Sequence, residues 1–227
     1  MTNVLLSGIV GSTAYGLAGP DSDVDRLGVY AAPTTAFLGL GKPDESIVTS
    51  RPDRTLHEVG KWVRLALGGN PTVMELAWLP DDLYEVRTPI GDELIGLRAA
   101  LLSARRVRDA YLGYATQQFR KLETRGDGSF SADTRKRTAK HARHLYRLCW
   151  QGLAIYTTGV VPVRLDDPQR FLDFGEQVAA GDIETARAML ASYEGLFDTA
   201  RTVLPDEPDF ARADAWLVDV RRRLLST

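Results

Sequence analysis

The chain has 227 residues, 44% hydrophobic and 26% charged, which is the composition of an ordinary globular protein. A formal net charge of −2 excludes a polycation that binds nucleic acid over its whole surface, so such a partner would need a local basic face. Cys149 is the single cysteine, which excludes an intrachain disulfide and fits a reducing cytoplasm. The first residues do not resemble a signal peptide and no apolar run could cross a bilayer, so we expect a cytoplasmic protein without membrane contact.

The N-terminal part of the chain is rich in short apolar runs that favour strands. A glycine-punctuated turn or very short helix is expected over 11–19, directly after the first of these runs. The pattern predicts strands over 3–10, 23–32, 45–50 and 54–59. Arg51, Pro52 and Asp53 form the turn between the third and fourth of them.

From Val59 onward the apolar residues follow helical spacing. The first helix ends at Gly68 and Gly69, and Asn70 with Pro71 is a typical N-cap and first position of the next. Further helices are expected over 91–123, 135–158, 168–180, 182–202 and 209–225, with a loop at 126–134. The sequence therefore predicts an α+β protein, with a small mixed-sheet head over residues 1–88 and a helical region over residues 89–227.

Two aspartates mark the start of the second predicted strand. Asp23 and Asp25 lie two residues apart, so on a strand their side chains point the same way, roughly 7 Å apart. Two carboxylates on one face repel each other unless a cation lies between them. A hard divalent cation such as Mg²⁺ is the natural partner, since it binds one or two carboxylates together with phosphate oxygens.

A glycine–serine turn precedes this acid pair by about ten residues. Gly11 lets backbone N–H groups approach phosphate oxygens without a side chain in the way, and the Ser12 hydroxyl can donate or accept locally. A solvated turn leading into an exposed strand is the alternative interpretation of this acidic stretch. A calcium loop is disfavoured because Ala32 stands where its glutamate belongs, and the glycines fit neither a dinucleotide fingerprint nor a P-loop.

These residues carry a resemblance to a known family. The stretch GSTAYGLAGPDSDVDRLGVY (11–30) resembles the active-site signature of the DNA polymerase β nucleotidyltransferase superfamily. Its detailed residue pattern is similar to that of the RlaP-like branch of predicted nucleotidyltransferases, which is linked to RNA repair. HEVGKWVRLALGGNPTVMEL (57–76) resembles that branch closely and KHARHLYRL (140–148) loosely, so the resemblance extends over most of the chain.

The resemblance implies a set of catalytic residues and a metal. Gly11 and Ser12 would hold the incoming triphosphate, and Asp23 and Asp25 would bind two Mg²⁺ ions, or alternatively Mn²⁺. A third carboxylate is expected on a neighbouring strand to help activate the attacking hydroxyl. We assign Asp53 to this role, as the third catalytic and metal-binding residue, with Glu58 as the second choice.

Four further residues are candidates for nucleotide binding. Tyr15 could stack on a base or be a core tyrosine, and Lys61 could reach a phosphate or lie on a solvated helix face. Lys140 and Arg143 belong to a basic helical stripe with Lys136 and Arg147, which would meet triphosphate or RNA if it faced the head.

The resemblance also implies a reaction. Two metal ions would activate an acceptor hydroxyl and hold the triphosphate, and in-line attack on the α-phosphorus would transfer NMP from a nucleoside triphosphate and release pyrophosphate. RNA is the expected acceptor. A protein side chain or small molecule as acceptor, and a non-catalytic nucleotide-binding module, are the alternatives, and the sequence does not indicate the oligomeric state.

Overall fold

Within the described residues, five strands form one mixed sheet in the order β3-β4-β2-β1-β5. The computed structural model describes residues 2–20, 22–124 and 132–225. The strands are β1 (Asn3–Ile9), β2 (Arg26–Ala31), β3 (Ser46–Ser50), β4 (Asp53–Glu58) and β5 (Tyr84–Arg87). β2 and β4 run parallel, whereas the other neighbouring pairs are antiparallel. The α+β class predicted from the sequence is confirmed.

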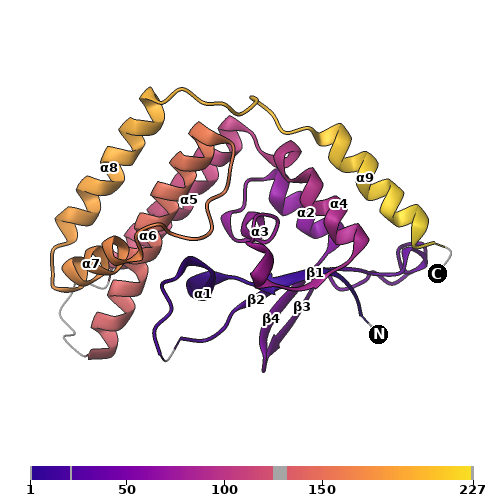
Figure 1. Cartoon of the computed structure of the whole chain (residues 1–227), viewed down its shortest axis with the longest axis horizontal. Coiled ribbons are helices and arrows are strands. Elements are labelled where there is room, and N and C mark those ends of the chain that lie inside the picture. Colours follow the sequence, from indigo (N-terminus) through magenta and orange to yellow (C-terminus); the bar gives the residue numbers. More distant parts are fainter. Residues whose placement is uncertain (1, 21, 125–131, 226–227) are drawn as a thin grey trace. The chain divides into compact units, whose positions relative to one another are not determined.

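Helices cover one side of this sheet. Helices α2 (Val59–Leu67), α3 (Pro71–Leu76) and α4 (Pro89–Leu97) contact its central strands and gather on the same side in Figure 1. The central strands and α2 contribute fully buried side chains, among them Leu6, Val29 and Trp62. Removing this apolar surface from water stabilises the layer.

The helix boundaries in this region follow local capping chemistry. The Asn70 side chain accepts hydrogen bonds from the backbone N–H groups of Thr72 and Val73, at 3.0 and 3.3 Å, and Pro71 opens α3. α2 ends before Gly68 and Gly69, as predicted. An N-cap satisfies donors that a helix leaves unpaired at its start, so this sequence signal is strong.

The chain divides into two compact units that are discontinuous in sequence. The first unit contains residues 1–103 and 207–227, and the second contains residues 104–206. The expected division after residue 88 lies inside the first unit, between β5 and α4. Helix α9 (Phe210–Arg223) belongs with the N-terminal residues instead of with the helices that precede it.

Ion pairs fasten α9 to the rest of the first unit. The Arg221 guanidinium lies 2.7 Å from Glu58 Oε1, and the Glu58 side chain is nearly enclosed. Arg221 also lies over the ring of Phe37, 4.2 Å from its centroid. Arg223 makes two hydrogen bonds to Glu93 at 2.9 and 2.6 Å. Breaking a buried pair by removing one partner typically costs several kcal/mol, so α9 is a structural part of this unit.

The second unit is helical in its described residues. Its helices are α5 (Ala104–Glu123), α6 (Ala132–Thr158), α7 (Pro168–Ala179) and α8 (Ile183–Thr199). Its core includes the fully buried Tyr111 and Phe171, and Tyr146 stacks on Phe171 with ring centroids 4.6 Å apart. Asp182 caps α8 by accepting from Thr185 N–H, and Asp209 caps α9, as the sequence suggested.

The short elements differ in whether they were predicted. α1 (Gly11–Tyr15) is a very short helix, one of the two structures expected for its stretch. β5, a four-residue edge strand, was not predicted. Single-turn 3₁₀ helices cover Thr34–Phe37, Asp81–Leu83 and Arg98–Leu101. The loop predicted over 126–134 lies mostly outside the described residues, and α6 begins within it at Ala132.

Candidate active site

The glycine–serine turn touches the acid pair. β1 ends at Ile9, and the Val10 N–H donates to the Asp25 carbonyl oxygen at 2.9 Å, which joins the two segments beyond the strand ladder. Gly11 has a φ of 69°, in the region that favours glycine. A Cβ at Gly11 would stand 2.5 Å from Asp25 Oδ2, so a side chain at this position would have to displace the carboxylate.

A hydrogen-bonded loop links the turn to the aspartates. Gly16 ends α1 in the left-handed conformation, and Leu17 N–H donates to the Ser12 carbonyl oxygen at 2.8 Å. The Ser22 hydroxyl accepts from Gly19 N–H at 2.9 Å. The loop therefore closes on itself immediately before Asp23, whose side chain is exposed.

Asp53 lies at the same rim of the sheet. β2 and β4 are parallel neighbours in which Arg26 pairs with Arg54, so Asp25 and Asp53 both stand one residue before this first pair. Neighbouring strands are about 4.8 Å apart. Asp25 is half-buried and Asp53 is exposed. The sheet thus brings Asp25 and Asp53 to one rim, and Asp23 precedes Asp25 by two residues, outside β2. No three acidic, histidine or cysteine side chains of the described residues are grouped tightly enough to form a metal site as they stand.

Glu58 occupies a different place. It ends β4 at the opposite end of the strand from Asp53 and is 5% exposed. Its carboxylate accepts from Gly60 N–H at 2.8 Å, which caps α2, and also pairs with Arg221. Both contacts hold the fold together, and neither faces the aspartate rim.

The remaining candidates are distributed over both units. Tyr15 is buried, 7% exposed, in α1 beside the turn. Lys61 lies on α2, and its ammonium group donates to Ser46 Oγ at 2.9 Å. Ser46 pairs with His57 on β4, four residues beyond Asp53. Lys140 and Arg143 lie on α6 in the second unit, where Lys140 is exposed and Arg143 is half-buried.

The family comparison is decisive for the class of this chain. The family described as RlaP, RNA repair pathway DNA polymerase beta family, matches residues 1–183. The chain belongs to this family. The match includes the glycine–serine turn, all three aspartates and the helix capped by Asn70, so the RlaP-like resemblance is confirmed. No curated protein matches the chain. None of its described helices has the length and hydropathy needed to cross a membrane.

The basic stripe of this RlaP-family chain is not continuous. Arg147, one of its four predicted members, is 3% exposed and donates to Gln151 Oε1 at 2.7 Å. Arg147 also lies 3.3 Å from Nδ1 of His144. Burial, with the cations Arg147, Lys121 and Lys140 nearby, lowers the pKa of His144 to about 3. Arg147 belongs to the interior of the helical unit, as does Cys149, whose pKa burial raises to about 12.

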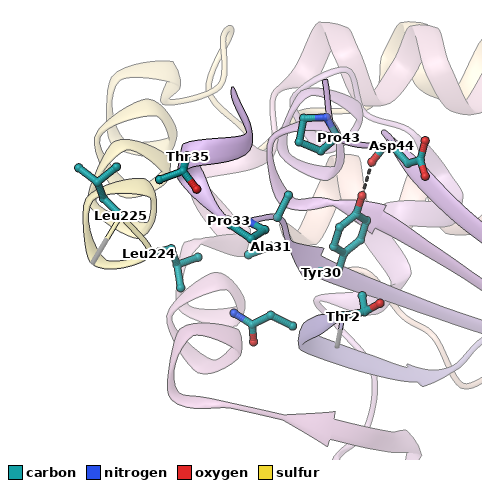
Figure 2. A pocket seen from close by; sticks show the side chains of 11 residues that line it. Thr2, Tyr30, Ala31, Pro33, Thr35, Pro43, Asp44, Leu224 and Leu225 are labelled. Atoms are coloured by element: carbon teal, nitrogen blue, oxygen red, sulfur yellow. Dashed lines mark hydrogen bonds between the residues drawn. The ribbon is translucent and has the colours of Figure 1, made fainter. Parts of the chain in front are cut away.

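A cavity of about 850 Å³ lies at the other end of the sheet (Figure 2). Its walls include Tyr30 and Ala31 from the end of β2, five and six residues beyond Asp25, and Leu224 after α9. The Tyr30 hydroxyl donates to the Asp44 carbonyl oxygen. Because the strand separates this cavity from the aspartates, it is not part of the candidate active site.

The sequence did not single out Ser46 or His57. Ser46 Oγ lies 2.8 Å from His57 Nδ1 as well as 2.9 Å from the Lys61 ammonium. The alternation of the two strands places Ser46 and His57 on one face, but only the register of the β3–β4 hairpin sets them opposite each other.

Replacing Gly11 should damage the candidate site and the fold together. Gly11→Ala adds a methyl group in an unfavourable φ region and against the Asp25 carboxylate, so we expect the protein to lose about 1–3 kcal/mol of stability. Thermal denaturation measures this, with Gly39→Ala as the matched control, because a Cβ at Gly39 meets nothing within 4 Å. Equal melting temperatures for the two variants would contradict the close approach of Gly11 to Asp25.

His144 should make stability depend on pH. The unfolded chain takes up a proton on this histidine below about pH 6.5, whereas the folded chain resists protonation until about pH 3. Stability should therefore fall as pH falls below 6.5, by up to about 1.4 kcal/mol per pH unit. Melting temperatures between pH 5 and pH 7 test this against His144→Gln, which should flatten the dependence. An unchanged slope would refute it.

Proposed function

We propose that the chain is a Mg²⁺-dependent nucleotidyltransferase that transfers NMP from a nucleoside triphosphate to a hydroxyl at an RNA end. The observation that carries the proposal is the close approach of Gly11 to the Asp25 carboxylate, which supports a phosphate-binding role for the turn beside a metal-binding aspartate. Membership of the RNA repair pathway DNA polymerase beta family supports both the chemistry and the acceptor.

The turn supplies the triphosphate side of this site. Gly11 has no side chain, so phosphate oxygens can approach the backbone, and Ser12 is half-buried beside it with a hydroxyl that can donate. Tyr15 packs beneath the turn, and its burial supports a role in fixing the turn in place. Lys140 and Arg143 lie in the second unit, and their role in nucleotide binding stays a prediction.

The carboxylates fit a hard divalent cation. Asp23, Asp25 and Asp53 offer only oxygen donors at one rim, which is the ligand chemistry that Mg²⁺ prefers, and Mn²⁺ accepts the same donors. When bound there, the metal would neutralise triphosphate charge and lower the pKa of the attacking hydroxyl.

The protein side chains then position the reacting groups. Asp53 would accept a hydrogen bond from the acceptor hydroxyl and orient its oxygen toward the α-phosphorus. The new O–P bond forms as the bond to the leaving pyrophosphate breaks, and the hydroxyl proton is released. Most of the rate enhancement in such a site comes from holding the two substrates in line and from neutralising charge.

Transfer of labelled nucleotide tests the proposal. The protein is incubated with each α-³²P-labelled nucleoside triphosphate, Mg²⁺ and a mixed RNA pool. We expect label in RNA, and a loss on the order of a thousandfold for Asp23→Asn or Asp25→Asn because the metal ligands are impaired. Asp214→Asn, an exposed carboxylate on α9, is the control and should behave as the wild type.

Other outcomes of this assay would change the proposal. Label on protein or on a small molecule would replace RNA as the acceptor and keep the chemistry. Binding of nucleotide without any transfer to these acceptors would favour a non-catalytic nucleotide-binding module.

The third carboxylate can be assigned by separating activity from stability. Asp53→Asn should lower the transfer rate at least about a hundredfold with little change in melting temperature, because Asp53 is exposed. Glu58→Gln should lower the melting temperature, since it leaves Arg221 without its buried counter-charge, and should keep the rate per folded molecule. Transfer kinetics and thermal denaturation of both variants measure this. The reverse pattern would assign the role to Glu58.

A further inference from the structure

A second polar cluster lies on the first unit, away from the aspartate rim. The Lys61 ammonium donates to Ser46 Oγ at 2.9 Å, and Ser46 Oγ lies 2.8 Å from His57 Nδ1. All three side chains are half-buried, so they are held in place but open to a ligand on one side. They come from three elements, α2, β3 and β4, and nothing in the proposed transfer step uses them.

The chemistry of the groups fixes the direction of one of the two hydrogen bonds. An ammonium group can only donate, so Ser46 Oγ accepts from Lys61, which leaves the Ser46 hydroxyl proton able to be donated to His57 Nδ1. In the tautomer that accepts this proton, the ring proton of His57 is on Nε2. Burial and the neighbouring Lys61 charge lower the pKa of His57, which keeps this ring neutral near pH 7.

In this tautomer the groups of the cluster that remain to bind a ligand are donors. They are the Nε2–H of His57, for which no described residue serves as acceptor, and the remaining N–H groups of Lys61. Glu45, directly before β3, is paired with Arg64 at 2.8 Å, so its charge is already matched. Convergent donors with a net positive charge fit an anion, and phosphate oxygens are acceptors of this kind.

The register of β4 gives the position of this cluster relative to the carboxylates. Asp53, Thr55 and His57 alternate along one face of the strand, with Ser50, Val48 and Ser46 opposite them on β3. Four residues separate Asp53 from His57, about 13 Å at 3.3 Å per residue. Between them Thr55 is half-buried and Val48 is 69% exposed, so a ligand lying along this face would meet a hydroxyl and an apolar side chain.

We propose that Ser46, His57 and Lys61 bind a backbone phosphate of the acceptor RNA strand upstream of the hydroxyl that reacts beside Asp53. This rests on the proposed function. In the proposed site the nucleoside triphosphate would lie at the Gly11–Ser12 turn, beside Asp25 and away from His57. An RNA strand repeats its phosphates and can reach both the rim and the cluster. At a rise of about 3.4 Å per nucleotide in a stacked strand, the bound phosphate lies roughly four nucleotides from the reacting end.

Binding of RNA in the absence of nucleotide tests the subsite. Fluorescence anisotropy with a labelled single-stranded 12-nucleotide RNA is measured for the wild type and for Lys61→Met. For Lys61→Met we expect RNA binding weakened on the order of tenfold, as for one lost charge-assisted contact. The slope of the logarithm of the binding constant against the logarithm of salt concentration should become shallower by about 0.7. Lys42→Met, an exposed lysine of the same unit, should bind as the wild type, and Lys61→Arg should restore the slope.

Uncharged methylphosphonate linkages can show which RNA phosphate contacts Lys61. Methylphosphonate linkages are placed one at a time along the RNA, and the wild type should lose affinity at a linkage a few nucleotides from the 3′ end, whereas Lys61→Met should be insensitive there. Loss of nucleoside triphosphate affinity in Lys61→Met with RNA binding intact would overturn the proposal, as would wild-type protein that binds no RNA. Melting temperatures confirm that each variant is folded.

The outcome is separable from that of the transfer assay. The wild type could transfer no label to RNA and still lose RNA affinity at one methylphosphonate linkage, with Lys61→Met insensitive there. In that case the proposed function fails and the phosphate subsite stands. If transfer occurs and Lys61→Met changes neither RNA affinity nor the methylphosphonate profile, the subsite fails and the proposed function stands.

Discussion

The close approach of Gly11 to the Asp25 carboxylate is the constraint around which the candidate site is built. It requires a residue without Cβ and with positive φ, and it requires that β1 and β2 be antiparallel neighbours, so that the end of one strand meets the approach to the other. The parallel pairing of β2 with β4 then adds Asp53 at the same rim. Like charges gathered in this way repel each other unless a cation lies between them, so the arrangement favours a cation-binding function.

The opposite end of β4 serves a structural purpose. Glu58 closes the strand, caps α2 and pairs with Arg221, so one carboxylate connects the sheet, the helix that covers it and a helix from far along the chain. Two acidic residues of a six-residue strand therefore have different environments. Asp53 is exposed at the rim, and Glu58 is enclosed where its charge is already matched.

Much of the fold could be predicted because its signals are local. Asn70 followed by Pro71, and the glycines that end α2, specify helix boundaries through backbone hydrogen bonds and φ preferences. β5 could not be predicted, because its four residues, YEVR, are too short to show a periodicity and are held by pairing with β1. The position of α9 depends on tertiary contacts of Arg221 and Arg223, which no local pattern encodes.

The candidate site and the polar cluster likewise contain features with local sequence signals and features that depend on tertiary contacts. The turn and the aspartate pair are contiguous in sequence and could be singled out from it, whereas the choice of Asp53 came from the family resemblance and stays a prediction. The partner of Lys61 could not, because Ser46 lies fifteen residues away and is brought there by the register of a hairpin. The buried state of Arg147, within an apparently uniform basic helix, likewise depends on which side of α6 packs inward.

The helical unit is an insertion into the first unit, and this orders the events of synthesis. The chain leaves the first unit after Ser103 and returns to it at Glu207. Close to these two points, Asp209 N–H donates a hydrogen bond to the Ala100 carbonyl oxygen. A ribosome has therefore made the whole inserted unit before Arg221 exists to neutralise Glu58. Until then Glu58, at one end of the sheet, lacks the arginine that matches its charge in the folded protein.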